Sequence, residues 1–388
     1  MTKIDLTKPL KPKLLNSDGP VCLIITARLK PVGNLDRFQP AGFPEVGHVI
    51  YDAPRAGEGN RKQKVCIIDS PASMANHLET VCVAGAGSMD LHSDLTNLPY
   101  VVCQTDGEVD VVSTLTEGHR LASDYFLDAT KKGRPFREIL RDEFKIVEVK
   151  KDKTYFIPPA KWWDIYTTIF KYDPNSLIHG VMFAKEQIKI SRLLTAHLEA
   201  FGAARVGRSG VKFDRLQKTT SGQPIFSVDE ETAEEIRATF VLDLAMLRSY
   251  GRGEDKGLNA AQKQLLLDLA IWKIKQLLVR PFRYRTQCFL GCESIKIETE
   301  VGVLQVVPQP NSNGPSVDTS EEPASDLLTE LPQLFSDIDI ANSIKGCGFK
   351  SDQTTRVDYP SSQLYKAGKE EVSDGASGDD DSTDEVED

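Results

Sequence analysis

The chain of 388 residues contains no long hydrophobic run. Its longest largely apolar stretch, residues 21–27, is far too short to cross a bilayer as a helix, which needs about 20 apolar residues. The opening sequence, MTKIDLTKPLKPK, also has no apolar core of the kind that a signal peptide carries. We therefore expect a cytosolic protein with no membrane contact.

Histidine is scarce, with six in the chain, and no two stand at the spacing of metal ligands. Cys288 and Cys292 form one pair, but no second pair completes a zinc site. The seven cysteines are scattered and odd in number, which disfavours a secreted disulfide framework and favours reduced, mostly buried thiols. We expect no metal and no other cofactor.

The common nucleotide-binding and hydrolase motifs are absent too. No Walker sequence occurs, and the G-x-G of Gly85 and Gly87 has Asp90 in place of a third glycine. That pair also follows an expected helix, whereas a dinucleotide fingerprint follows a strand. Residues 207–210 do not have the G-x-S-x-G spacing of a nucleophile elbow.

His119 and Arg120 form the one local pattern that suggests acid–base chemistry. The only carboxylates near them in sequence are Glu117 and Asp124. A histidine on a helix is more often a packed or hydrogen-bonding residue than a catalytic base. No complete catalytic set is recognisable, so the chain is not expected to be an enzyme.

The net charge of −10 is unevenly distributed along the chain. Residues 370–388 hold ten acids and no Lys or Arg, and residues 309–369 hold nine acids against five bases. This leaves 38 acids and 42 bases in residues 1–308, a charge of about +4. The sequence predicts a slightly basic folded body followed by a solvated acidic tail, and a tail that competes with nucleic acid for the basic surface is the alternative.

Hydrophobic periodicity predicts a mixed α+β protein. Strands are expected where β-branched residues cluster or alternate, and helices where apolar residues recur every three or four positions. The expected strands are 21–30, 64–69, 100–103, 176–184 and 282–307, with a basic glycine loop passing into a strand over 204–213. The expected helices are 71–83, 115–127, 135–144, 161–171, 190–201, 230–250 and 259–279.

These elements suggest three regions. Residues 1–308 form the folded domain, interrupted by a glycine- and proline-rich excursion over about 31–63 and by helical insertions over about 113–171 and 229–279. Residues 309–366 have the composition of a poorly ordered linker with room for a short helix. Residues 367–388 are predicted to be a disordered acidic tail.

Cations recur beside glycine or aromatic residues at strand ends and in loops. Arginine and glycine-loop amides can grip phosphates while rings stack on bases, so this grouping is typical of an RNA-binding surface. Isolated solvated cations are the alternative for each position. The candidate residues are Arg28 and Lys30, Arg37 with Phe38, the glycine-flanked Arg205, Arg208, Ser209 and Lys212, and Arg283 with Arg285.

Six strings of the sequence resemble one family. They are PVGNLDRFQPAGFPEVG (31–47), DSPASMANHLE (69–79), LPYV (98–101), LTEGHRLASDY (115–125), IHGVMFA (178–184) and GRSGVKFD (207–214). Together they look like the backbone subunit of type I-G, formerly I-U, CRISPR surveillance complexes, the Cas-seven kind of the RAMP superfamily. The likeness runs from about residue 21 to residue 288.

The resemblance implies a modified RNA-recognition (ferredoxin-like) core with inserted helical lobes and a thumb-like hairpin. It implies a non-catalytic subunit of a prokaryotic, cytoplasmic Cascade complex that serves antiviral defence. Several copies would stack in a helical filament along the guide crRNA, beside other Cascade subunits. Target DNA would be read by pairing with the guide, while the protein holds shape and charge.

The resemblance also singles out residues within the matching strings. Asn76, His119 and Arg120 are polar members of these strings on expected helices, where they would bond phosphate or ribose. Packing of those helices against the sheet is an equally good explanation. By the same resemblance, Arg28 and Lys30 would contact the RNA backbone, and Arg37 with Phe38 would contact RNA or a neighbouring subunit.

Two rival functions stay open at this point. The first is a RAMP-family metal-dependent ribonuclease acting on guide precursor or target RNA with a loop aspartate, although nothing in the sequence marks Asp36, Asp52 or Asp106 for that role. The second is a protein-interaction scaffold whose arginines face acidic partners.

Overall fold

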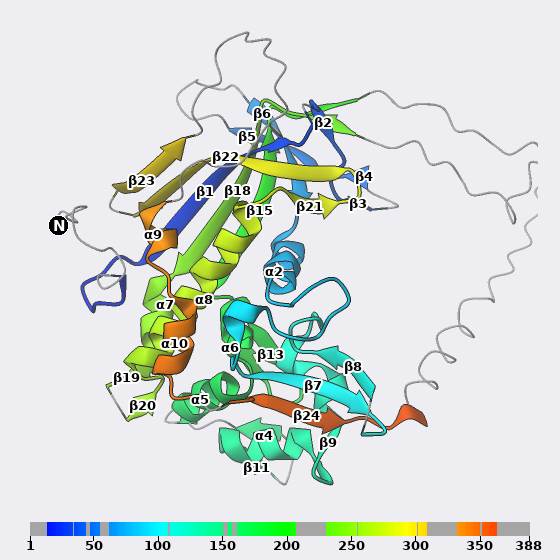
Figure 1. Ribbon diagram of the computed structural model, residues 1–388, viewed down its shortest axis with the longest axis vertical. Helices are drawn as coiled ribbons and strands as arrows, with labels where there is room; N and C mark the ends of the chain where they lie inside the picture. The colour runs from blue at the N-terminus through cyan, green and yellow to red at the C-terminus, as the bar shows by residue number, and fades with distance from the viewer. Residues whose placement is uncertain are drawn as a thin grey trace, which may run out of the picture.

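The computed structural model describes residues 14–362 except 34, 44–46, 55–61, 108, 150–153, 157–160, 207–229, 254, 301, 309–331 and 350. Two sheets organise this part of the chain (Figure 1). No helix in the described ranges combines the length and the apolar character that a membrane span needs.

The larger sheet has eight strands in the order β21-β22-β1-β18-β15-β6-β5, with β23 also paired to β22. Every neighbouring pair runs antiparallel. Buried and half-exposed residues alternate along the central strands, so one face lies in the core and the other does not. The strands are β1 (Cys22–Pro31), β5 (Ile50–Pro54), β6 (Lys62–Asp69), β15 (Leu194–Phe201), β18 (Glu235–Asp243), β21 (Phe282–Arg285), β22 (Cys288–Thr299) and β23 (Gly302–Pro308).

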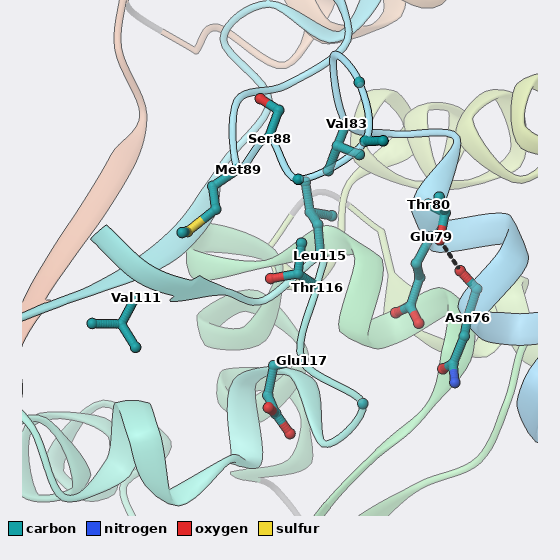
Figure 2. Close-up of a pocket in the computed structure, with 14 residues that line it drawn as sticks. Asn76, Glu79, Thr80, Val83, Ser88, Met89, Val111, Leu115, Thr116 and Glu117 are labelled. Carbon is teal, nitrogen blue, oxygen red and sulfur yellow. Dashed lines mark hydrogen bonds between the residues drawn. The ribbon is translucent and has the colours of Figure 1, made fainter. Parts of the chain in front are cut away.

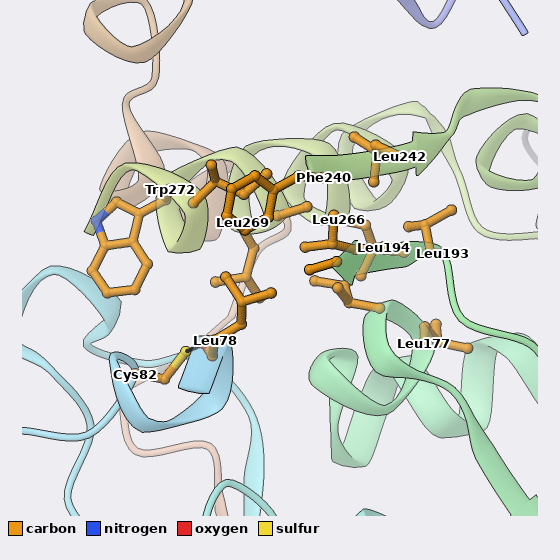
Figure 3. Packing of buried hydrophobic residues seen from close by; sticks show 14 of the residues in the cluster. Leu78, Cys82, Leu177, Leu193, Leu194, Phe240, Leu242, Leu266, Leu269 and Trp272 are labelled. Carbon is orange, nitrogen blue, oxygen red and sulfur yellow. Dashed lines mark hydrogen bonds between the residues drawn. The ribbon is translucent and has the colours of Figure 1, made fainter. Parts of the chain in front are cut away.

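Helices α2 (Pro71–Thr80) and α8 (Ala260–Leu278) cover the buried face of this sheet (Figure 1). The Ser70 hydroxyl caps α2, and Asn259 with Gln262 forms a capping box at the start of α8. Figure 3 shows Leu266 and Leu269 of α8 packed between the strands and α2. Burial of these apolar side chains fixes which face of the sheet is left uncovered.

The smaller sheet has the order β10-β9-β24-β7-β8 and is packed with short helices. Its strands are β7 (Tyr100–Thr105), β8 (Val109–Ser113), β9 (Thr130–Lys131), β10 (Arg134–Pro135) and β24 (Thr354–Asp358). The helices around it are the 3-10 helix η2 (Arg120–Ala122), α3 (Asp124–Leu127), α4 (Phe136–Phe144), α5 (Trp162–Tyr172) and α6 (Pro174–His179). The predicted insertion over about 113–171 thus lies largely in this lobe.

Short elements fill the connections. In the excursion over 31–63 lie β2 (Arg37–Phe38), β3 (Gly42–Phe43) and β4 (Gly47–His48), and β2 pairs with β17, which pairs with β16. The others are η1 (Ser93–Leu95), β11 (Val147–Val149), β12 (Thr154–Phe156), β13 (Val181–Phe183), β14 (Ile188–Ile190), β16 (Ala204–Arg205), β17 (Glu231–Thr232), α7 (Leu244–Ser249), β19 (Gly251–Arg252) and β20 (Lys256–Gly257).

The sequence-based prediction was wrong for several elements. Residues 190–201 and 230–250 were expected to be helices, but they contain strands β15 and β18, so only the second half of the predicted insertion over 229–279 is mainly helical. The expected strand over 176–184 is divided between the end of helix α6 and the short strand β13, and the expected helix over 115–127 is reduced to η2 and α3. In each case the local sequence suits both a helix and a strand, and packing against the rest of the fold decides which of the two forms.

The segment expected to be a poorly ordered linker, 309–366, is folded where the structure describes it. Helices α9 (Gln333–Ser336) and α10 (Ile340–Gly346) precede β24, and α10 packs on α8. Strand β24 lies between β7 and β9 in the smaller sheet, with Val357 buried. The folded body therefore extends beyond residue 308.

The seven cysteines carry no disulfide, and five of them are buried. Burial raises the pKa of Cys66 and of Cys103 to about 12, which keeps these thiols protonated and unreactive. The predicted burial of most of the thiols is confirmed.

A chain that ends at residue 349 is expected to melt roughly 5 °C lower than the full chain or more. It would lose the pairing of β24 with β7 and the burial of Val357, which together stabilise the fold by about 2 kcal/mol. Each kcal/mol of lost stability lowers the melting temperature by about 2–4 °C. A chain that ends at residue 366 keeps β24 and is expected to melt like the full chain, because residues 367–388 contain almost nothing to bury. Calorimetry checks both, and equal melting temperatures for the two truncations would contradict the role of β24.

Candidate nucleic-acid interface

The uncovered face of the large sheet carries rows of polar side chains across four neighbouring strands. Arg28 on β1 lies directly opposite Arg237 on β18, which in turn lies opposite Glu199 on β15. In the next row, Thr26 lies between Lys296 of β22 and Thr239, with His197 beyond. These residues are half-exposed or exposed, whereas their sequence neighbours on β1, β15 and β18 are buried in the core.

The facing pair Arg28 and Arg237 is the main electrostatic feature of this face. Like charges directly opposite on neighbouring strands disfavour folding, so the protein bears a cost here that an anion would remove. Two carboxylates partly compensate: Glu293 lies 3.5 Å from Arg28 Nε, and Glu235 accepts from Arg237 at 2.9 and 3.0 Å. The Arg28 side chain is still 55% exposed and that of Arg237 35%. The pair can therefore receive a phosphate from solvent.

An aromatic ring completes this part of the face. Arg237 lies over the ring of Phe201, with its guanidinium carbon 4.2 Å from the ring centroid. Lys30 stands near the same end of the sheet, next to Leu29, which pairs with Ile236. Arginine, lysine and an aromatic ring on one open sheet face form the combination that binds single-stranded nucleic acid by its phosphates and bases.

The sequence analysis found Arg28 and Lys30 but missed Arg237, Phe201 and His197. It missed them because residues 190–201 and 230–250 were predicted to be helical. The signal that could have found them is the strict alternation in LTAHLEAF and EIRATFVLD, whose side chains alternate between core and open face.

A second basic group forms where the excursion meets strands from the middle of the chain. Strand β17 lies between β2 and β16, which brings Arg37 and Arg205 to one small sheet. Arg37 Nε lies 2.9 Å from Glu230, and Arg205 Nε lies 3.1 Å from the buried Glu231, which also bonds His48 at 2.8 Å. Both arginines are partly exposed, so they are anchored by carboxylates while part of each faces solvent.

Three of the glycine-flanked candidates cannot be placed. Arg208, Ser209 and Lys212 lie outside the described residues. Phe38, in contrast, is only 1% exposed and belongs to the core. Its predicted contact with RNA or with a neighbour is therefore wrong in this conformation, because a ring in the core cannot stack on a base.

Arg283 and Arg285 lie on the edge strand β21. Arg283 is exposed and lies over the ring of Phe289, with its guanidinium carbon 5.8 Å from the ring centroid. Arg285 bonds Asp69 at 2.5 Å and Ser73 at 3.2 Å, at the start of α2. Burial alone would raise the pKa of Asp69, but hydrogen bonds from His77 and Ser73 and the charge of Arg285 lower it below its usual value. Arg285 is thus held in a structural ion pair, and Arg283 is the more accessible cation.

Arg120 lies inside the protein, where it forms an ion pair instead of facing RNA. Its guanidinium donates to Glu79 at 2.5 and 3.0 Å, and to the carbonyls of Gly118 and Gly180 at 3.3 Å. The residue is 7% exposed, so the predicted contact with RNA is wrong for Arg120. Arg120 instead joins η2 to α2 through this buried ion pair.

Asn76 and His119 are accessible, on opposite sides of this ion pair. Asn76 lies on the exposed side of α2, and the His119 ring is 85% exposed and bonds Glu117 at 3.1 Å. Asn76 lines a cavity of about 440 Å³ between α2, the 85–89 loop and the 115–118 loop (Figure 2). The buried Glu79 and the half-buried Glu117 also line the cavity, and their carboxylates disfavour phosphate binding there.

In the described ranges, no three His, Cys, Asp or Glu residues gather in a way that could hold a metal ion. Of the three aspartates considered for a ribonuclease, Asp36 is exposed beside Arg37, Asp52 is exposed on β5, and Asp106 is in the turn after β7. Their side chains belong to three separate places in the fold.

Residues 23–205 match the model of a family described as CRISPR-associated protein GSU0053. A comparison with curated proteins found no match. Among solved structures, the chain is similar to one described as "CRISPR RNA-guided surveillance complex, pre-nicking", at 11% identity and a TM-score of 0.34, covering 71% of this chain and 75% of that chain. It is also similar to Csc2 of Thermofilum pendens, at 12% identity and a TM-score of 0.28, covering 76% of each chain.

Proposed function

We propose that the chain is a non-catalytic backbone subunit of a CRISPR effector (Cascade) complex. Several copies would bind along a guide crRNA and present it for pairing with target DNA. The observation that carries this proposal is the pair of facing arginines, Arg28 and Arg237, on an open sheet face beside an aromatic ring. The family match over residues 23–205 supports the CRISPR assignment, and the type I-G strings support the subtype.

The order of the central strands supports an RNA-recognition (ferredoxin-like) core. Taken along the chain, β1, helix α2, β15, β18, helix α8 and β22 follow a βαββαβ pattern, with β6 inserted before α2. In space these strands lie in the order β22-β1-β18-β15, all antiparallel, with both helices on one face. We propose that the opposite face holds the RNA.

In this arrangement the strand of RNA would follow the rows across the open face. Arg28 and Arg237 would bind phosphates, and the basic group at Arg37 and Arg205 would extend the contact onto the excursion, the proposed thumb. Contacts to phosphates carry no sequence information, so one protein could hold any guide. The bases would stay available for pairing, and neighbouring copies and other Cascade subunits would complete the groove.

The test is whether the protein purified from its native host or co-expressed with a CRISPR array carries RNA. We expect a raised ratio of nucleic-acid to protein ultraviolet absorbance and, after extraction, RNA of defined length. A particle free of RNA would overturn the proposal and favour the protein-interaction scaffold. Incubation with labelled RNA and a divalent metal tests the ribonuclease alternative, which requires cleavage that is lost when Asp36, Asp52 or Asp106 is replaced by Asn.

A further inference from the structure

A cavity of about 550 Å³ lies at the end of the open sheet face where β15 begins. Its wall comes from the loop before η2, the junction of α6 and β13, and the segment that joins β14 to β15. No Asp or Glu lines it, in contrast to the cavity of Figure 2, which Glu79 and Glu117 line. The nearest acid in sequence, Glu117, bonds His119 at the rim. The hollow is therefore positive.

Two cations at this wall have no counter-charge. Lys189 lies on β14, and Arg192 lies just after the end of that strand. Both residues are exposed and line the cavity. Neither forms an ion pair with any carboxylate in the part of the chain that the structure describes. Most other arginines at the predicted interface are bonded to acids, so this pair differs from them in being free to bind an anion.

A buried histidine in the same wall has an unused donor. His179 is 1% exposed, and its Nε2 lies 3.0 Å from the ammonium of the buried Lys273. An ammonium only donates, so Nε2 accepts and the neutral ring carries its proton on Nδ1. That Nδ1 has no hydrogen-bond partner among the described residues. Burial, then the charges of Lys273, Arg120 and Arg192, hold the pKa of His179 well below its usual value, consistent with a neutral ring.

Gly180 allows the two sides of the wall to approach. A Cβ at this position would lie 2.8 Å from the carbonyl oxygen of Ile190 and 3.1 Å from the backbone nitrogen of Arg192. Its φ of +80° also lies in the region that favours glycine. The chain thus brings Arg192 close to His179 by backbone packing, and the cavity is built into the fold before any ligand binds.

We propose that this cavity binds a phosphate group, with the exposed Lys189 and Arg192 supplying the positive charge and the buried, neutral His179 forming part of its wall. The assignment of that phosphate to a nucleic-acid strand rests on the proposed function. Thr195 of β15 lies on the open sheet face and also lines the cavity, so the two surfaces are continuous. It stands four residues from Glu199, which pairs with Arg237, a separation of about 13 Å along the strand.

The test compares the full chain with a Lys189→Glu/Arg192→Glu variant and with a matched control, Arg252→Glu/Lys256→Glu. Arg252 and Lys256 are an exposed pair of cations opposite each other on the β19–β20 hairpin, which contributes no residue to the cavity. The probes are inorganic phosphate, read as a rise in melting temperature, and single-stranded RNA of one sequence with a 5′-phosphate or a 5′-hydroxyl, read by fluorescence anisotropy. The variants change surface residues, and circular dichroism confirms that each is folded.

We expect phosphate to stabilise the full chain and the control but not the cavity variant, and RNA affinity to fall about tenfold or more in the cavity variant alone. Equal loss with both RNAs would assign the site to an internal phosphodiester, and loss confined to the 5′-phosphorylated RNA would assign it to a strand end. Phosphate stabilisation without any RNA binding would keep the phosphate site and overturn the nucleic-acid function. Equal stabilisation of the cavity variant and the control by phosphate would overturn the site.

Discussion

Replacing both facing arginines, as Arg28→Gln/Arg237→Gln, is expected to abolish RNA retention without unfolding the protein. Each arginine makes a charge-assisted contact worth roughly 1.5–3 kcal/mol, so the loss of two weakens RNA binding by about 100-fold or more. The slope of log affinity against log salt should also become shallower by about 1.4, since each phosphate contact on a single strand contributes about 0.7. Filter binding over a series of salt concentrations measures both quantities.

The same variant is expected to be nearly as stable as the parent or slightly more so. The two guanidinium groups lie opposite each other on β1 and β18, and glutamine removes their repulsion while it keeps the length and polarity of the side chain. A purely structural role for these arginines predicts the reverse, a clear loss of stability with RNA binding unchanged. Urea denaturation separates the two explanations.

The control for this variant is Arg252→Gln/Lys256→Gln. These residues are also exposed cations in direct cross-strand register, but on the β19–β20 hairpin away from the open face. The control should leave RNA affinity within about twofold of the parent, because scattered surface cations contribute only long-range potential, which salt screens. An equal loss in both variants would show that RNA senses overall charge, and the open face would no longer be the site.

The strength of local signals explains which parts of this fold could be read from the sequence. Helices α2 and α8 have clear caps at Ser70 and Asn259 followed by apolar residues at helical spacing, and both were predicted within a few residues. Strand β1 was equally clear because it begins with a short apolar run that contains β-branched residues. Strands β15 and β18 were wrongly predicted because alanine and leucine within them also suit a helix, and their alternation of apolar and polar residues was not weighed against this.

The candidate site could be predicted less completely from the sequence, because it depends on which residues of neighbouring strands are paired. Arg28 was found from its position at a strand exit, but its counterpart Arg237 is more than two hundred residues away in the chain and becomes its neighbour only through pairing of β1 with β18. Arg120 shows the opposite error. Its place in a string that resembles the family suggested a contact with RNA, whereas its side chain is buried and bonds Glu79. Burial of a charged side chain depends on a partner elsewhere in the fold, which local sequence does not reveal.

That buried pair leads to the largest expected effect on stability. Glu79 of α2 and Arg120 of η2 are 3% and 7% exposed, and Asn175 also donates to Glu79 at 2.7 Å. Arg120 further has a φ of +53°, a conformation that a residue other than glycine adopts only when its surroundings hold it there. The pair lies between the cavity of Figure 2, which Glu79 lines, and the proposed phosphate cavity, which Arg120 lines.

Arg120→Ala is expected to lower the free energy of unfolding by about 3–5 kcal/mol, because it leaves the Glu79 carboxylate buried without its counter-charge. Arg356→Ala, which breaks an exposed pair with Asp110, should cost less than about 1 kcal/mol. Replacing both partners, as Arg120→Met/Glu79→Leu, should recover part of the stability lost in Arg120→Ala, since no unpaired charge is then buried. Urea denaturation of the parent and the three variants measures these changes in the free energy of unfolding. A loss below about 1 kcal/mol for Arg120→Ala would mean that water reaches Glu79, and the wall between the two cavities would then be open.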